Sequence, residues 1–132
     1  MDTYMQLAEE AGNVIDIGCT DKNIKQALDF AESIDSYKRI RVVTGWQWLD
    51  VVFNDEYLAA IKNDGLLPSL IICQDLVYDS RLFITTSRGR VRTSLLEKYH
   101  SVYSVFETRN SFYILKGTGN RKTVMAELIF NI

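Results

Sequence analysis

The alternation of apolar and polar positions from Val102 to Ile132 predicts three strands joined by two tight turns. We expect Arg109-Asn110 to form the first turn, because asparagine tolerates the left-handed conformation that two-residue hairpins need. This register places two sets of residues on opposite faces. One set is Ser104, Phe106, Tyr113 and Leu115, and the other is Tyr103, Val105, Phe112 and Ile114. Both faces are mainly apolar, so both need a cover.

Two amphipathic helices are predicted upstream. Thr20 or Asp21 is expected to cap the first, whose apolar residues recur at helical spacing. Asn54 is expected to cap the second, which ends at Gly65. The apolar stripe of the first helix consists of Ile24, Ala27, Leu28, Ala31 and Ile34.

The region from Arg39 to Phe53 has the period of a strand, and its even-numbered residues from Ile40 to Trp48 are expected to share one face. Because the apolar residues change parity after Asp50, a bend or bulge is predicted between Gly45 and Asp50. Further strands are predicted at Ser69–Tyr78, Leu82–Thr86 and Arg90–Leu96, with a helical turn or loop at Glu97–Ser101.

Together these elements predict a single α+β domain over residues 1–132. Its twisted, mainly antiparallel sheet ends in a three-strand meander, with two amphipathic helices on one face. The other face needs either the Trp46–Phe53 strand folded over it or a second copy of the protein. For the second case, the expected dimer interface is Tyr103, Val105, Phe112 and Ile114.

Composition adds little to this picture. The chain is 47% hydrophobic and 24% charged, as is ordinary for globular proteins. It lacks an apolar run of about 18 residues, and its acidic N-terminus lacks the features of a signal peptide, so we expect a cytoplasmic protein without membrane contact.

The charge is −6 over residues 1–66 and +4 over residues 67–132. This asymmetry suits either a polyanion site or facing surfaces in a dimer, but neither half is as basic as a dedicated nucleic-acid domain.

The residue types give no clear catalytic or metal site. His100 is the only histidine, and neither Cys19 nor Cys73 has a partner at ligand spacing, so we expect no metal and no cofactor. The glycine-rich segment 117–123 lacks the spacing of a phosphate loop and leads into a strand, so a hairpin loop is favoured. An enzyme using Asp50, Asp79, Glu107 or His100 would need two of these carboxylates in one cleft.

Several residues are candidates for binding. Trp46 and Trp48 belong either to the core or, with Tyr78, to a ligand pocket. Glu107 and Arg109 are expected to form a local ion pair or to brace the turn. The alternating Arg88, Arg90 and Arg92 could follow a phosphate backbone, or could protect a strand edge. The candidate ligand-binding or partner-binding residues are Trp46, Trp48, Asp50, Tyr78, Asp79, Arg92, Glu107 and Arg109.

Four segments also carry a family resemblance: Trp46-Gln47-Trp48-Leu49, the stretches 76–80 and 91–96, and above all the hairpin from Phe106 to Leu115. The chain resembles an uncharacterised family of small bacterial proteins encoded on mobile elements, including integron gene cassettes. The likeness covers about Ile40 to Thr123. It departs from the family pattern at Thr118, where the family favours proline. The resemblance implies a bacterial, cytoplasmic, accessory protein and carries no activity.

The sequence therefore predicts an accessory protein of unknown function that acts by binding, as a homodimer and without catalysis. The first alternative is a small-molecule or peptide-binding module with a pocket lined by Trp46, Trp48 and Tyr78. The second is nucleic-acid binding by the Arg88, Arg90 and Arg92 strand, although nucleic acid is not the expected partner.

Overall fold

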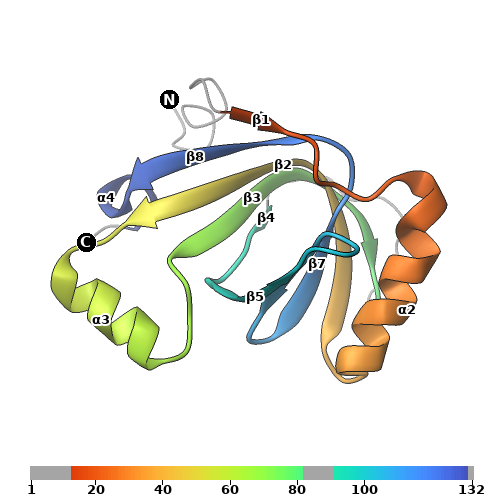
Figure 1. Cartoon of the computed structure of the whole chain (residues 1–132), viewed down its shortest axis with the longest axis horizontal. Helices are drawn as coiled ribbons and strands as arrows, with labels where there is room; N and C mark the ends of the chain where they lie inside the picture. Colours follow the sequence, from red (N-terminus) through yellow and green to blue (C-terminus); the bar gives the residue numbers. More distant parts are fainter. Residues whose placement is uncertain (1–12, 82–90, 131–132) are drawn as a thin grey trace.

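The structure is a computed structural model, and it describes residues 13–81 and 91–130. The described residues form a mixed sheet with helices outside it (Figure 1), which agrees with the predicted α+β class. The elements are β1 (Asn13–Ile15), η1 (Asp21–Asn23), α2 (Ile24–Ile34), β2 (Arg39–Val52), α3 (Asp55–Asn63), β3 (Ser69–Asp79), β4 (Val91–Arg92), β5 (Leu96–His100), β6 (Val105–Thr108), β7 (Ser111–Leu115), β8 (Gly119–Met125) and α4 (Ala126–Ile129).

Strand β2 is the centre of the sheet. β3 runs antiparallel along one edge of β2, and β7 and β8 run parallel to it. The remaining pairs are antiparallel, so the prediction of a mainly antiparallel sheet missed the two parallel pairs at its centre. Figure 1 shows the strands curling into a half-barrel, with α2 packed outside one end.

The β6–β7 hairpin has the predicted register, with Val105 opposite Ile114 and Phe106 opposite Tyr113. The third strand of the expected meander is different, because β8 does not continue antiparallel to β7. Strand β7 follows β2 as far as Val43, where the amide of Lys116 donates to the Val43 carbonyl over 3.0 Å. The chain then turns, and β8 resumes beside β2 from Gln47 onward. A central strand as long as β2 therefore accommodates β7 and β8 in succession.

The Arg109-Asn110 turn also differs from the expected left-handed turn. Among the described non-glycine residues, only Ser104 has a positive φ. The hydroxyl of Thr108 stabilises the turn instead. It donates to the Ser111 carbonyl and accepts from the Ser111 amide, both over 3.2 Å. The turn therefore does not depend on the ability of Asn110 to adopt a left-handed backbone conformation.

Strand β2 changes face at Gly45, at the start of the predicted bend. Gly45 has φ +60°, which an L side chain rarely adopts. Before it, Ile40 and Val42 pack against α2. After it, Trp46 and Trp48 belong to the cluster on the other face. The expectation that these residues share one face is therefore wrong, because the left-handed residue shifts the alternation.

Helix α2 covers one face of the sheet, as its apolar stripe predicted. Ala27 and Ala31 are fully buried and pack with Val105, Phe112 and Ile114. The start of the helix differs from the prediction, because Thr20 makes no side-chain capping bond and a 3-10 turn precedes α2.

Helix α3 has the predicted ends, since the Asn54 side chain accepts from the amide of Tyr57 over 2.9 Å and Gly65 has φ +75°. However, none of its residues is buried, so it does not cover the sheet. In Figure 1 it lies at the opposite end of the molecule from α2. The prediction of two helices on one face is therefore wrong.

The face away from α2 is covered by the curled sheet itself. Trp46, Trp48, Phe106 and Tyr113 form a cluster there, which Leu96 of β5 completes. Residues 97–101 were expected to form a helical turn or loop, but most of them belong to strand β5, which pairs with β6. A third cluster lies between the sheet and α4. Both faces of the hairpin are thus covered within one chain.

This arrangement changes the role of the residues assigned to a dimer interface. Val105, Phe112 and Ile114 are 0% exposed beneath α2, and Tyr103 is half-buried against Phe30. Val105, Phe112 and Ile114 stabilise the subunit and are not available to a partner in this structure, whereas Tyr103 keeps an exposed part. Within the described part of the chain, no helix is long and apolar enough to span a membrane.

Candidate functional site

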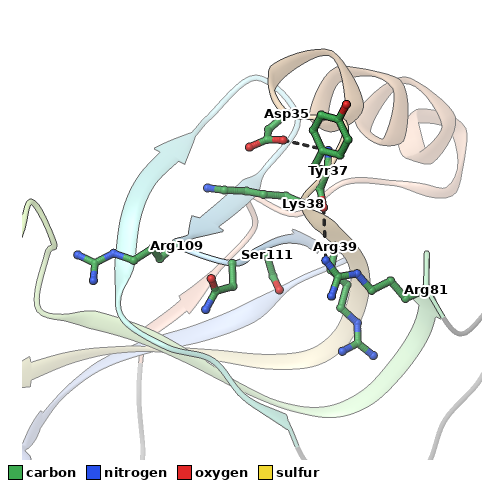
Figure 2. A pocket seen from close by; sticks show the side chains of 8 residues that line it. Asp35, Tyr37, Lys38, Arg39, Arg81, Arg109 and Ser111 are labelled. Atoms are coloured by element: carbon green, nitrogen blue, oxygen red, sulfur yellow. Dashed lines mark hydrogen bonds between the residues drawn. The ribbon is translucent and has the colours of Figure 1, made fainter.

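A pocket of about 370 Å³ opens where three connections meet (Figure 2). We call it the basic pocket. The α2–β2 connection and the start of β2 contribute residues 35 and 37–39 to its lining. Arg81, which follows the end of β3, is also part of the lining, and the β6–β7 turn contributes residues 109–111. The lining residues are Asp35, Tyr37, Lys38, Arg39, Arg81, Arg109, Asn110 and Ser111. Four of these side chains are cationic, and one is anionic.

Arg39 is held by Asp79, whose side chain is fully buried. The Arg39 guanidinium engages both carboxylate oxygens, with Nε 2.8 Å from Oδ1 and Nη2 on Oδ2. Arg41 donates to the same carboxylate over 3.2 Å and to the Tyr113 hydroxyl over 3.0 Å. Two guanidinium groups thus share one carboxylate, so a net positive charge remains beside the pocket.

The pKa values follow from this geometry. Burial alone would raise the pKa of Asp79, but hydrogen bonds from Arg39 and the Arg81 amide, with the charges of Arg39 and Arg41, lower it to about 2. The hydrogen bond to Asp79 raises the pKa of Arg39 despite burial. Asp79 is therefore ionised at neutral pH and positions Arg39.

The charge of Lys38 is compensated inside the protein. Its Nζ lies 2.5 Å from Glu107 Oε2, 2.9 Å from the Thr108 carbonyl and 3.5 Å from Glu97. The other oxygen of Glu107 lies 2.7 Å from His100 Nε2. Burial raises the pKa of Glu107, but the hydrogen bonds and charges of Lys38 and His100 outweigh burial and lower it. Lys38 therefore contributes the aliphatic part of its side chain to the pocket lining more than it contributes its charge.

Arg81 and Arg109 provide the uncompensated charge. Arg81 donates to the Tyr37 carbonyl over 3.4 Å, and Arg109 donates to the Asp64 carbonyl over 2.9 Å. Figure 2 shows Arg81 reaching toward the Tyr37 carbonyl. Within residues 13–81 and 91–130, no carboxylate lies within ion-pair distance of either guanidinium. Neutral carbonyls leave a guanidinium able to bind an anion.

Both tryptophans lie in the core. Trp46 is 1% exposed and Trp48 is 4% exposed. The Trp46 indole donates to the Lys116 carbonyl over 3.1 Å, and the Trp48 indole donates to Asp50 over 3.1 Å. Tyr78 packs in the other cluster, beneath α2. The structure therefore does not bring these three aromatic residues together around one opening.

Asp50 belongs to the surroundings of Trp48. It accepts from Arg121 over 2.7 Å and from Ser69 over 2.8 Å, and Arg121 lies over the Trp48 ring. Burial raises the pKa of Asp50, but the hydrogen bonds from Arg121, Ser69 and Trp48 and the charge of Arg121 lower it overall. This arrangement orients the indole and closes the edge of the core.

The remaining predicted groups are separate. Arg92 donates to the Ile129 carbonyl over 3.2 Å and lies over the Phe130 ring, whereas Arg88 and Arg90 lie outside the described residues. Glu107 and Arg109 do not form the expected local ion pair, because each has its own partner on another element.

The carboxylates of Asp50, Asp79 and Glu107 each engage different cations, so the structure does not gather them around one reacting atom. In the described part of the chain, no group of three or more metal-ligating side chains could hold an ion.

Three of the residues predicted from the sequence lie at the basic pocket: Arg109 lines it, while Asp79 and Glu107 hold Arg39 and Lys38. A role in binding stays a prediction for each of them. Tyr37, Lys38, Arg39 and Arg81 were not predicted as site residues. The basic residue that follows the predicted strand and Asp79 was an available indication for Arg81, but the long separation between Arg81 and Arg109 in the sequence gave no sign that both line one pocket.

The fold and the pocket define a small α+β domain with a mixed half-barrel sheet and a basic pocket between its connections. Residues 16–131 match the family model described as Domain of unknown function (DUF6957), and the chain belongs to this family. No curated protein and no solved structure matches the chain. The family match agrees with the resemblance to a family of unknown function, and the link to integron cassettes stays a prediction.

Proposed function

We propose that this protein is a non-catalytic binding domain that holds an anionic group of its ligand in the basic pocket. The observation that carries the proposal is the pair Arg81 and Arg109. Both line one pocket, and among the described residues their guanidinium groups are hydrogen-bonded only to backbone carbonyls. A carboxylate or a phosphate would provide the missing negative charge.

The chemistry of the lining supports an oxyanion as the bound group. The guanidinium group is planar and presents several N–H donors, which match the spacing of carboxylate and phosphate oxygens. Asn110 and Ser111 lie in the same lining and add an amide and a hydroxyl. Hydrogen bonds from charged donors to an oxyanion are among the stronger ones in proteins.

Binding is favoured over catalysis because Asp79 and Glu107 already have structural partners, and Asp35, the one carboxylate in the lining, accepts from the Tyr37 amide. The carboxylates of Asp79 and Glu107 are each engaged by two basic side chains, and Nε2 of His100 lies at Glu107. A general base needs a free lone pair within reach of its substrate. The side chains that line the basic pocket therefore suit the binding of an anion more than catalysis.

The earlier alternatives now have different support. The first alternative, a small-ligand module, becomes the proposal, with the basic pocket in place of a pocket at Trp46, Trp48 and Tyr78. An accessory role in bacteria stays a proposal that rests on the family resemblance. Binding of nucleic acid by the arginine strand has no support from Arg92, whose guanidinium is engaged by Ile129 and Phe130.

The test is a titration with inorganic phosphate and with acetate at low ionic strength, followed by calorimetry or by amide shifts in NMR spectra. We expect saturable binding of at least one anion, with shifts at residues of the basic pocket. The double variant Arg81→Gln and Arg109→Gln should weaken it at least tenfold, because each lost charged hydrogen bond contributes about 1.5–3 kcal/mol. The double variant Lys22→Gln and Lys25→Gln, at exposed positions of η1 and α2, removes two positive charges elsewhere and is the control. Equal weakening by the control, or no saturable binding, would contradict the proposal.

A further inference from the structure

We propose that the ligand is a nucleoside phosphate, whose phosphate lies in the basic pocket and whose base stacks on Tyr37. This inference rests on the proposed function and adds the ligand class. It depends on an exposed aromatic residue, Tyr37, that is one of the residues lining the basic pocket.

Tyr37 is the most exposed large hydrophobic side chain among the described residues, at 90%. Its backbone is nevertheless fixed on both sides. The Tyr37 amide donates to Asp35 Oδ1 over 2.9 Å, and the Lys38 amide donates to the Asp35 carbonyl over 3.3 Å. The ring is therefore presented to solvent by an ordered turn. Tyrosines presented in this way supply a large contact area at a small cost in conformational entropy.

Arg81 connects the ring with the charge. Its guanidinium donates to the carbonyl of Tyr37 itself, so the cation that we assign to anion binding lies at the base of the aromatic residue (Figure 2). A ligand with its anionic group at Arg81 and a planar group a few bonds away can reach both. A phosphate joined through a sugar to a base has this arrangement.

The size and polarity of the pocket agree with the same ligand. Its volume of about 370 Å³ lies at the low end of the range for small-molecule sites. The pocket therefore suits a phosphate and a sugar, while the base lies outside against the ring. Asn110 and Ser111 provide polar groups for sugar hydroxyls. A simple inorganic anion would leave Tyr37 without a role, and stacking would contribute to affinity with any of the bases.

The test compares the affinities of four probes by calorimetry: inorganic phosphate, ribose 5-phosphate, adenosine monophosphate and a short oligothymidylate. We expect adenosine monophosphate to bind about tenfold more tightly than ribose 5-phosphate, because stacking of one base on an aromatic ring adds about this much affinity. Tyr37→Ala should remove this difference, and Tyr37→Phe should retain it, since the ring and not the hydroxyl carries the stacking. The readout is the ratio of the two affinities within each protein, so a change in phosphate binding itself does not enter the comparison.

The outcomes separate this inference from the proposed function. If phosphate binds but the base adds no affinity, or if Tyr37→Ala leaves the difference intact, the ligand class is wrong and the anion pocket stands. If none of the four probes binds but acetate does, the ligand class is wrong and the anion pocket stands. If acetate does not bind either, both are wrong. Tighter binding of the oligothymidylate, with a steep loss of affinity as salt rises, would support a strand of nucleic acid as the source of the nucleotide. Equal or tighter binding of the monophosphate would support a free nucleotide.

Discussion

Asp79 is the residue on which the charges near the pocket depend. It is fully buried, and its negative charge faces two guanidinium groups that are mostly buried themselves. Removing one member of such a cluster is costly, because the remaining charges lose their partner without regaining full hydration. We therefore expect Asp79→Asn to lower the free energy of unfolding by about 3 kcal/mol at pH 7. Urea unfolding of the variant measures this loss. Asp75→Asn, at an exposed position of the same strand, is the control and should change stability by less than about 0.5 kcal/mol.

The pH dependence of this effect has a definite sign. The pKa of Asp79 falls from its ordinary value of 3.8 to about 2 in the folded protein. A lowered folded-state pKa gives stability that is present above the unfolded pKa and is lost as pH falls through the folded pKa. The contribution is therefore complete above about pH 5 and decreases by about 2 kcal/mol between pH 4 and pH 2. Unfolding curves across this range should show the gap between wild type and Asp79→Asn becoming smaller. A gap that is constant with pH would contradict the assigned pKa.

At the scale of elements, local patterns were predictive and long-range pairing was not. The β6–β7 register followed from the turn length and from the alternation around Arg109-Asn110. The cover provided by α2 followed from its stripe at helical spacing. By contrast, the position of β8 depends on the length of β2, which leaves space for another strand beyond Val43. No sequence pattern within residues 117–125 indicates that β8 pairs with this part of β2.

The candidate site was predictable only in part for the same reason. Trp46 and Trp48 were prominent because of their residue type, but burial decides whether a tryptophan binds a ligand, and burial depends on the whole fold. The basic pocket joins residues from three connections far apart in the sequence. Its individual arginines resemble any solvated arginine until the fold places Arg81 and Arg109 in one lining.

The β6–β7 hairpin provides a prediction at this scale. Its turn depends on the Thr108 hydroxyl, which makes two hydrogen bonds with the backbone of Ser111. Thr108→Val keeps the shape of the side chain but leaves the buried Ser111 groups without this partner. We expect a loss of about 1–3 kcal/mol in the free energy of unfolding. Thr118→Val, at an exposed position in the next connection, should have little effect. Chemical denaturation of both variants tests the difference, and equal stabilities would contradict the role of Thr108.

At the scale of the whole molecule, the curled sheet replaces the dimer as the cover of the second apolar face. Helix α2 shields one face of the hairpin, and the opposite face is enclosed by β2, β3 and β5. The reason for expecting a homodimer was an uncovered apolar face, and the half-barrel removes that reason. The exposed apolar residues that remain include Val52 and Met125, which lie opposite each other on β2 and β8, and Leu128 on α4.

We therefore predict that the protein is a monomer at micromolar concentration. The exposed large apolar residues of the described part of the chain are spread over several separate elements, whereas a stable interface needs about 800 Å² from each partner. Size-exclusion chromatography with light scattering should give a mass near 15.2 kDa over a tenfold range of concentration. A species of twice that mass would contradict the prediction. In that case Met125→Glu would locate the interface, because it places a charge in the middle of these residues without entering the core. A dimer that resists this substitution would have to use a surface other than the end of β2 and β8.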